Sequence, residues 1–390
     1  MKIAFYMTTI LEYGGGLEKY LIETAANLAQ RPGITADVIT MDDRVTHRIT
    51  GGLSIFWMKK LDTSLSHKEN VHDIRRRLGK ARYFKELTIC SLRKRLQQYD
   101  VIYSKNELIE GFCLRFLLRY GTLPPVIFGG HTPIFYPLAT SFHGRLHNAL
   151  YGGPVYRFLA GGVQKFHALN TADAARYARL FPRRPVSCIY NPFDIDAFRR
   201  RSKQHRYDLL DADSAMIRIL WMGRLSEQKG VGDLPALIAT VQRAAKQHQI
   251  RISWSIFGDG EDRPHIERLA RTNSMVHYYG HADQAYVPSI YARHHIFVST
   301  SKWEGYPYTL IEAQAFGLQI FAYDIPGVSD ILHAYEGGHL AANPDELAEL
   351  LIQALVTYRL PGNVPTSQPS KQFEPTATYN QLLELLGARS

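Results

Sequence analysis

Short apolar runs alternate with longer amphipathic stretches along both halves of the chain. Apolar runs rich in Ile, Val, Phe and Tyr predict strands of the first half at 2–9, 36–41, 101–104 and 126–128. The same pattern predicts strands of the second half at 217–222, 252–257, 275–279 and 296–299. Three- and four-residue apolar repeats predict helices at 17–29, 233–247 and 262–271. Alternating strands and helices predict parallel sheets that helices cover on both faces.

The length of the chain indicates two domains, because 390 residues exceed the size at which one hydrophobic core usually stops growing. Segment 183–215 mixes prolines and charge runs with few long apolar stretches, so it suits a connection, and we place the boundary near Asn191. We therefore expect an α/β protein with domains at 1–190 and 191–375. The terminal segment 376–390 carries a helical pattern and could cap either domain, joining the first if it packs there.

Composition is that of an ordinary folded protein, with 45% hydrophobic and 21% charged residues. Three widely separated cysteines, Cys90, Cys113 and Cys188, favour a reducing compartment over a disulfide framework. The polar pair Thr8 and Thr9 comes too early for a signal-peptide core, and no apolar run approaches about 18 residues. We expect a cytoplasmic location.

The net charge of +10 is concentrated in the first half. Residues 1–190 hold 27 Lys and Arg against 14 Asp and Glu, whereas residues 191–390 hold 19 against 22. Segment 75–95 is strongly basic, and its surroundings predict an amphipathic helix with the apolar positions Val71, Ile74, Leu78, Ala81, Phe84 and Leu87. That helix would pack on the first domain or dock on an anionic membrane surface. Nucleic-acid binding is disfavoured because no recognition motif accompanies the charge.

The segment after the predicted strand at 296–299 is a candidate anion site. Pro307 suits the start of a helix and Gly317 its end, so backbone N–H groups should emerge at a helix N-terminus on the carboxyl edge of a parallel sheet. Glu304 precedes this helix and Glu312 lies within it. We expect one carboxylate to reach a sugar and the other a ribose.

A second candidate follows the strand at 217–222. Arg224 offers a planar fork of donors and Lys229 a point charge, and the two together suit a pyrophosphate. Gly258 follows the next strand in a tight turn that would let the backbone approach a ligand. In the first half, the glycine run 14–16 follows the first strand, where a tight α/β turn or a dinucleotide site is the alternative interpretation. His131 follows the strand at 126–128 and could instead be an ordinary packed histidine.

These motifs together resemble the retaining glycosyltransferases of family 4, which have the GT-B fold of two facing Rossmann-like domains with parallel sheets and an interdomain cleft. The matching elements occur in the family's order: Gly15-Gly16-x-Glu18, Gly223-Arg224-Leu225 with Lys229-Gly230, Gly258-Asp259-Gly260, and Glu304 with Glu312 as the E-x7-E pair.

The resemblance implies a role for each matching residue. Donor binding would involve Gly15, Gly16, Arg224, Lys229, Gly258, Glu304, Thr309, Leu310 and Glu312. Within this set, Arg224 and Lys229 would hold the diphosphate, Glu312 the ribose hydroxyls and Glu304 the transferred sugar. His131 would lie near the sugar and the acceptor, so the implied catalytic residues are Glu304, His131, Arg224 and Lys229.

The implied activity is transfer of a sugar, with retention of anomeric configuration, from a UDP-sugar or, next in preference, a GDP-sugar. The acceptor would be lipid-linked or a polysaccharide on the cytosolic face of a membrane, in glycolipid or cell-surface glycan synthesis. Fixed cations would stabilise the departing diphosphate, so no metal and no cofactor is expected.

Three alternatives stay open. Asp194 with Asp196 and Asp211 with Asp213 match the Asp-x-Asp metal motif, but they lie in the connection, where solvated polar residues are the simpler interpretation. A nucleotide-sugar epimerase would share the fold without the pair of glutamates in this context. A catalytically inactive relative would bind a nucleotide sugar or a partner as a regulatory module.

Overall fold

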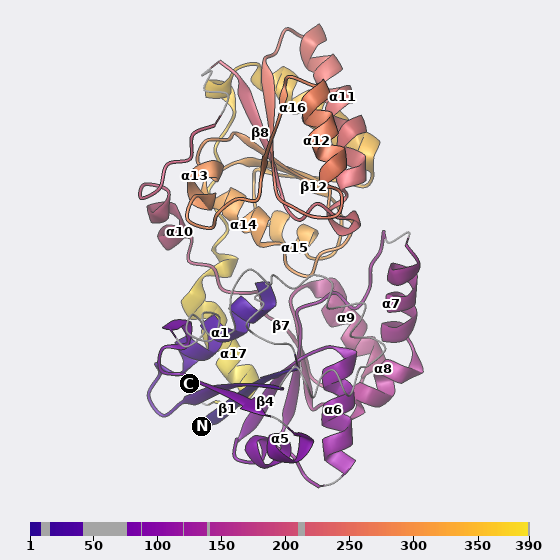
Figure 1. The fold of residues 1–390 in the computed structure, drawn as a ribbon, viewed down its shortest axis with the longest axis vertical. Helices are drawn as coiled ribbons and strands as arrows, with labels where there is room; N and C mark the ends of the chain where they lie inside the picture. Colours follow the sequence, from indigo (N-terminus) through magenta and orange to yellow (C-terminus); the bar gives the residue numbers. More distant parts are fainter. Residues whose placement is uncertain are drawn as a thin grey trace.

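The computed structural model describes residues 1–8, 16–41, 76–86, 88–119, 121–138, 141–209 and 215–388. In these residues the chain forms two α/β domains, which lie one above the other in Figure 1, and each domain is built on one sheet. Every strand pairing within the two sheets is parallel. The predicted pair of Rossmann-like domains is confirmed.

The N-terminal domain has a seven-stranded sheet in the order β3-β2-β1-β4-β5-β6-β7. Its strands are β1 (Lys2–Met7), β2 (Thr35–Met41), β3 (Arg82–Glu86), β4 (Val101–Lys105), β5 (Val126–Gly130), β6 (Lys165–Ala168) and β7 (Val186–Cys188). Its helices are α1 (Gly16–Leu28), α5 (Ile89–Leu96), α6 (Leu108–Arg119), α7 (Phe142–Gly152), α8 (Pro154–Leu159) and α9 (Thr171–Leu180). Residues of β1 face two separate buried clusters in alternation, Ile3 and Phe5 on one side and Ala4 and Tyr6 on the other, so helices cover both faces.

The C-terminal domain has a six-stranded sheet in the order β10-β9-β8-β11-β12-β13. Its strands are β8 (Ile217–Met222), β9 (Ile252–Phe257), β10 (Val276–Gly280), β11 (Ile296–Ser299), β12 (Gln319–Tyr323) and β13 (Gly338–Ala341). Its helices are α10 (Ile195–Arg201), α11 (Leu234–Gln247), α12 (Arg263–Thr272), α13 (Val287–Tyr291), α14 (Tyr308–Ala315), α15 (Val328–Leu332) and α16 (Pro344–Tyr358). One continuous hydrophobic cluster fills this domain.

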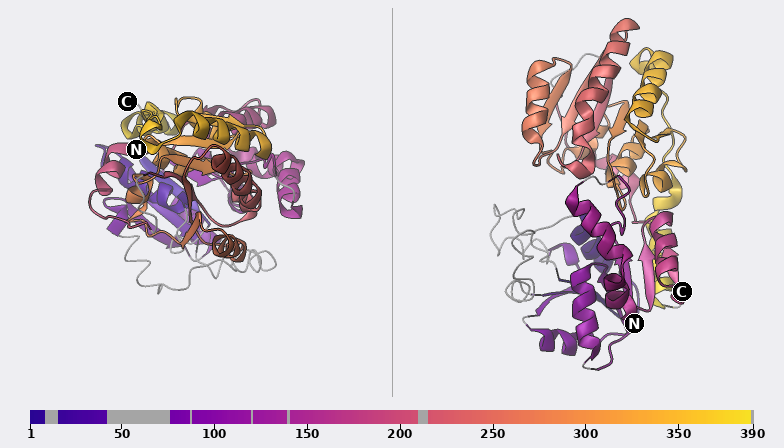
Figure 2. Two further views of the ribbon diagram at one scale, coloured as in Figure 1. Left: turned by 90° about the horizontal axis from the view of Figure 1, so that it is seen from above. Right: turned by 90° about the vertical axis from the view of Figure 1, so that its right-hand side faces the viewer.

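The chain crosses between the domains twice. The first crossing lies between Ile189, in a buried cluster of the N-terminal domain, and Phe198, in the C-terminal core. The second returns through Phe373 to the last helix, α17 (Pro375–Leu386), whose leucines pack in the same cluster as Ile189. The two crossings touch, since the N–H of Phe193 donates to the carbonyl of Phe373 at 2.9 Å. Both termini therefore lie in the N-terminal domain, as Figures 1 and 2 show.

The predicted amphipathic helix at 71–87 is wrong beyond residue 78: residues 76–78 are helical, but the helix ends there. Gly79 adopts φ +58°, which helical residues do not tolerate, and Arg82–Glu86 form strand β3 beside β2. The aromatic pair Tyr83 and Phe84 favours a strand at this position. Val71 and Ile74 lie outside the described residues.

The hydrophobic pattern did not predict five of the strands: β3, β6, β7, β12 and β13. All five are only three to five residues long, and β6 (KFHA) and β13 (GHLA) carry polar residues within them. Such short segments give too few positions for a period to emerge. In the described part of the chain, no helix combines the length and apolar character needed to span a membrane.

Candidate active site

The C-terminal sheet has its topological switch point between β8 and β11, which are neighbours in space although two strands separate them in the chain. Ligands of open α/β sheets bind at such points, outside the carboxyl ends of the strands. The loop 223–230 follows β8, and the loop 300–307 follows β11. The sequence candidates Arg224, Lys229 and Glu304 all lie on these two loops.

The two loops are joined by backbone contacts that fix Lys229. Gly230 adopts φ +63°, and a Cβ there would lie 1.8 Å from the carbonyl oxygen of Thr300, so only glycine fits. The hydroxyl of Thr300 donates to the carbonyl of Lys229 at 2.8 Å, and the N–H of Lys302 donates to the carbonyl of Gln228 at 2.8 Å. The position of the Lys229 side chain is therefore set by both loops together.

Lys229 and Glu304 form an ion pair between the lysine Nζ and the carboxylate Oε1. The exposed fraction of the lysine side chain is 20%, and that of the glutamate is only 7%. A carboxylate this well buried needs a partner, because desolvation disfavours an isolated charge. The structure thus brings together one cation and one of the two predicted acids at the switch point.

Helix α14 begins just after this pair. Pro307 is its N-cap, and Gly317 follows it with φ +72°, as the sequence predicts. Thr309 and Leu310 lie in the first turn, where the N–H of Leu310 already donates to the carbonyl of Pro307 at 3.2 Å. Glu312 lies one turn further along and is partly buried. The pKa of Tyr291 in α13 is raised first by burial of its ring and second by the negative charge of Glu312. Glu312 therefore lies beside that ring.

Arg224 and Gly258, two further C-terminal candidates, follow the neighbouring strands β8 and β9. Arg224 is exposed on the loop after β8. Gly258 has φ +143°, and a Cβ there would lie 1.8 Å from the carbonyl oxygen of Gly223. The sequence suggested that Gly258 makes room for a ligand, and the structure gives it the additional task of making room for the loop that carries Arg224. The N–H of Leu225 and the carbonyl of Asp259 bond at 2.9 Å across the same contact.

In the N-terminal domain, His131 ends a hydrogen-bonded chain that crosses the adjacent strands β4, β5 and β6. The hydroxyl of Tyr103 lies 2.9 Å from Nε2 of His131 and 2.6 Å from Nδ1 of His167. Nε2 of His167 lies 2.7 Å from the carbonyl oxygen of Ile189. Gly129 makes the chain possible, because a Cβ at this position would lie 2.1 Å from the Tyr103 hydroxyl.

The hydrogen bonds through Tyr103 and His167 fix the tautomer of His131. Burial lowers the pKa of His131 well below its usual value and that of His167 to about 4, so both rings are neutral near pH 7. The carbonyl of Ile189 can only accept, so His167 carries its proton on Nε2 and accepts the Tyr103 hydroxyl proton on Nδ1. The oxygen of Tyr103 must then accept from Nε2 of His131. Nδ1 of His131 is left with a lone pair and can accept a hydroxyl proton.

The two candidate regions meet at the domain interface. A Cβ on Gly305, next to Glu304, would lie 2.8 Å from the carbonyl oxygen of His131, so the two loops are in close contact. Asn170 donates from Nδ2 to the carbonyl of Gly305 at 3.3 Å. The ring of Tyr20, on α1, lies 4.4 Å from the ring of His131 between centroids.

An aromatic stack also bridges the domains. Trp303, the neighbour of Glu304, stacks on Tyr136 with 4.8 Å between centroids, and Tyr136 stacks on His147 of α7 at 3.8 Å. Nε2 of His147 donates to the carbonyl of Pro133 at 2.9 Å, which holds the ring in place. The loop that carries Glu304 is therefore packed directly against the N-terminal domain.

The structure describes only some of the other sequence candidates. Gly15 lies outside the described residues, and Gly16 is the first residue of α1. Asp194 caps α10 by accepting from the N–H of Ala197 at 2.7 Å, while Asp211 and Asp213 are outside the described residues.

The sequence reasoning missed the bridge of Tyr136 and Trp303 and the two partners of His131. Tyr103 and His167 lie within short strands, where polar aromatic residues could have drawn attention. The glycine pair before His131 was the further signal, since small residues on a strand indicate a close approach.

Two family models match the chain and together cover most of it. The model described as Glycosyltransferase Family 4 matches residues 14–197, and the model described as Glycosyl transferases group 1 matches residues 217–357. The chain belongs to the glycosyltransferases of family 4 type, with the GT-B fold.

Individual relatives share this architecture at low identity. HepE of Anabaena, in a crystal structure with UDP and glucose, is 17% identical, with 99% of each chain covered and a TM-score of 0.67. The lipopolysaccharide outer core galactosyltransferase WaaB in its apo form is 16% identical, with 98% of each chain covered and a TM-score of 0.61. An uncharacterized 41.2 kDa protein in the cps region of Klebsiella pneumoniae is 21% identical over 147 residues. That match spans 38% of this chain and 38% of the relative.

Proposed function

We propose that this glycosyltransferase moves a sugar, with retention of anomeric configuration and without a metal, from a nucleoside diphosphate sugar to a lipid-linked or polysaccharide acceptor. UDP is the preferred carrier, with GDP next. The enzyme would work in the cytoplasm, at the inner face of the cell membrane, in glycolipid or cell-surface glycan synthesis.

The observation that carries the proposal is the Lys229 and Glu304 pair at the switch point of the second sheet. Breaking the bond between the anomeric carbon and the phosphate leaves negative charge on the diphosphate and positive charge on the sugar. Lys229 turns from Glu304 toward the diphosphate, Arg224 closes on it from the same loop, and the N-terminus of α14 faces it. Glu304 is then free to hold a hydroxyl of the transferred sugar.

Across the interface, His131 contributes an acceptor rather than a charge. Its neutral ring presents Nδ1 to a sugar or acceptor hydroxyl, since Nε2 is bound to Tyr103. The contact between the His131 loop and Gly305 places this acceptor next to the loop of Glu304. Tight packing of the two domains there excludes water, which would otherwise hydrolyse the donor.

The choice of carrier and acceptor is supported by relatives. HepE has been crystallised with UDP and glucose, and WaaB is a lipopolysaccharide galactosyltransferase. Fixed cations at the leaving group support a reaction without metal, and the proposal includes that an added chelator leaves turnover unchanged.

The first experiment is a thermal-shift screen with nucleoside diphosphates and their sugars, because a ligand that binds only the native state raises the melting temperature. The best donor is then assayed for nucleotide release, and the anomeric proton of the product is observed by NMR. Glu304→Gln is expected to lower turnover by about 100-fold or more, the usual effect of removing one group that stabilises a transition state. Lys302→Met, which alters a neighbouring lysine on the same loop, serves as the matched control.

Three outcomes would count against the proposal. Inversion at the anomeric carbon would remove the retaining mechanism. Full turnover in Glu304→Gln would remove the assigned site. Binding of a nucleotide sugar without any transfer or hydrolysis would favour the inactive relative.

A further inference from the structure

Residues 111–172 contain no Asp or Glu, although they make up about a sixth of the chain. The same stretch holds five basic residues: Arg115, Arg119, Arg145, Arg157 and Lys165. It includes most of α6 and all of α7 and α8, which lie along one flank of the N-terminal domain in Figure 1. The one acidic residue of these helices, Glu110, is fully buried and accepts from the N–H of Thr8 at 2.8 Å. The outer face of these helices therefore presents no acidic side chain.

This face also gathers the exposed apolar side chains. Eleven large hydrophobic residues are exposed in the described part of the chain, and six of them lie on α6, α7 and α8: Phe112, Phe116, Phe142, Leu146, Val155 and Phe158. Single exposed apolar residues are normal, but a cluster of this kind marks an interaction surface. Phe142 and Phe158 are 76% and 62% exposed, so folding alone does not explain them.

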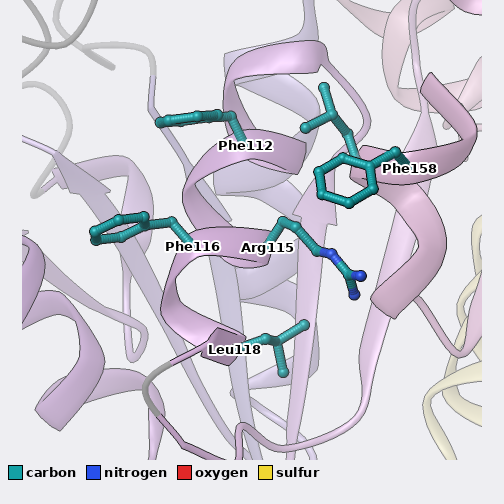
Figure 3. Close-up of a pocket in the computed structure, with 6 residues that line it drawn as sticks. Phe112, Arg115, Phe116, Leu118 and Phe158 are labelled. Carbon is teal, nitrogen blue, oxygen red and sulfur yellow. The ribbon is translucent and has the colours of Figure 1, made fainter. Parts of the chain in front are cut away.

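The centre of the face is a hollow between α6 and α8. It has a volume of about 560 Å³ and is lined by Phe112, Arg115, Phe116, Leu118, Phe158 and Leu159. Figure 3 shows Phe112 and Phe116 projecting from successive turns of α6, with Arg115 reaching toward Phe158. The guanidinium of Arg115 lies 4.9 Å from the centre of the Phe158 ring. The hollow thus offers aromatic surface and a cation side by side.

We propose that the face formed by α6, α7 and α8, with its centre at Phe112, Arg115 and Phe158, docks on an anionic lipid bilayer. Aromatic side chains insert at the level of the headgroups, and the arginines bind lipid phosphates. The charge of the face favours a bilayer over a protein partner, because the face is basic and lacks the acidic groups that a mixed protein interface would pair. Only the purpose of docking rests on the proposed function: the bilayer would deliver a lipid-linked acceptor to the enzyme.

The position of the face suits that purpose. α7 starts at the domain interface, where the N–H of Ser141 lies 3.3 Å from the carboxylate of Glu227 in the loop after β8. Phe142 is the next residue, so the docking face reaches the edge of the candidate active site. A lipid-linked acceptor held in the bilayer would then have a short path to the site.

The basic segment 75–95, which the sequence singled out for this contact, is less suited to it. Arg82 forms two hydrogen bonds to Asp37 at 2.9 and 2.8 Å, and Arg95 bonds to Glu86 at 2.7 Å. The ring of Phe84 lies under both guanidinium groups, at 5.4 and 4.1 Å. Phe84 and two arginines of this segment are therefore engaged within the protein.

The test is co-sedimentation of the full chain with vesicles of phosphatidylcholine alone, and of equal parts phosphatidylcholine and phosphatidylglycerol. We expect binding to the anionic vesicles only, with a decrease in high salt. Phe112→Ser combined with Phe158→Ser should weaken binding by at least about ten-fold, and Arg115→Gln by about five-fold, the value of one basic residue near an anionic surface. Leu360→Ser, which changes a side chain 57% exposed on the other domain, and Lys80→Gln, in the basic segment, should bind as the parent does.

The outcomes separate the possibilities. No binding of the parent chain to anionic vesicles, or equal binding by the double Phe variant, overturns the proposal. An equal loss in Lys80→Gln would move the contact to segment 75–95. Dimers of the parent that the double Phe variant no longer forms, seen by analytical ultracentrifugation, would assign the face to a second copy instead. The double Phe variant should keep its thermal shift with a nucleotide sugar, so failure here is distinguishable from failure of the proposed function.

Discussion

Replacing Lys229 should destabilise the C-terminal domain far more than replacing its partner Glu304. In Lys229→Met the carboxylate of Glu304 keeps its position, 7% exposed, without a cation. Removing one partner of a buried ion pair costs about 3 to 5 kcal/mol, and the lower end applies because the lysine is 20% exposed. In Glu304→Gln the amide oxygen can still accept from Lys229, so about 1 kcal/mol is expected.

Urea unfolding followed by tryptophan fluorescence measures this difference. Trp221, Trp254 and Trp303 all lie in the C-terminal domain, so three of the four tryptophans of the chain report on it. With a slope of about 2 to 3 kcal/mol per M, a loss of about 3 kcal/mol moves the midpoint down by about 1 to 1.5 M. Glu304→Gln should move it by less than half as much, although both variants lose transfer activity.

The chain provides its own control in a second lysine pair close by. Lys302 lies 3.7 Å from Asp233, with side chains 23% and 22% exposed, so Lys302→Met should cost at most about 1 kcal/mol. Combining Lys229→Met with Glu304→Gln should recover stability relative to Lys229→Met alone, because no buried charge is left. If Lys229→Met proves no less stable than Lys302→Met, the argument that Glu304 depends on Lys229 is refuted.

Three further predictions address the site and its support. Gly230→Ala should lower the free energy of unfolding by about 2 kcal/mol or more, because φ is +63° and the new Cβ would lie 1.8 Å from a backbone atom. Gly232→Ala is the control, because the space around it is open, and it should change the free energy of unfolding by no more than about 0.5 kcal/mol. Equal unfolding midpoints for the two variants would contradict this. Tyr103→Phe breaks the link to His131 and should lower kcat/KM by about ten-fold in the transfer assay, and an unchanged value would show that the tautomer of His131 is irrelevant. Burial lowers the pKa of His167 from 6.5 to about 4, so the unfolded chain binds the proton at a higher pH than the folded one, and stability should fall as the pH drops through that range. Urea midpoints taken near neutral pH and at about pH 5 measure this slope, and His167→Gln should flatten it. An identical slope in the variant would exclude His167 as a cause.

The hydrophobic pattern determined much of the C-terminal domain. The bounds of β8, β9 and β11 agree with the predicted strands, and α11 differs by one residue. These strands are buried along most of their length, so their apolar runs are continuous and their ends are marked by glycine or polar residues. Because strand ends place the loops, the sequence could also assign Lys229 and Glu304 to one edge of one sheet.

Only the tertiary structure decided how these residues meet. The pairing of β8 with β11 brings together loops about 75 residues apart, and nothing local encodes that adjacency. The sequence left open which domain α17 would cap, and the answer comes from the apolar surface that the sheet around β1 leaves to be covered. A local pattern also misread β3, where pairing with β2 outweighs a helical period.

The surroundings of His131 show the same division. The sequence provides a histidine after a strand, preceded by two glycines. Its hydrogen-bond partner Tyr103 comes from β4, and the next residue of the hydrogen-bonded chain, His167, comes from β6. These strands lie on either side of β5, which ends just before His131. The sequence by itself determined which residue types stand at strand ends, because local propensity and periodicity are properties of neighbouring residues. The tertiary structure decided which of them touch, and hence their burial, tautomers and pairing, because these depend on groups distant along the chain.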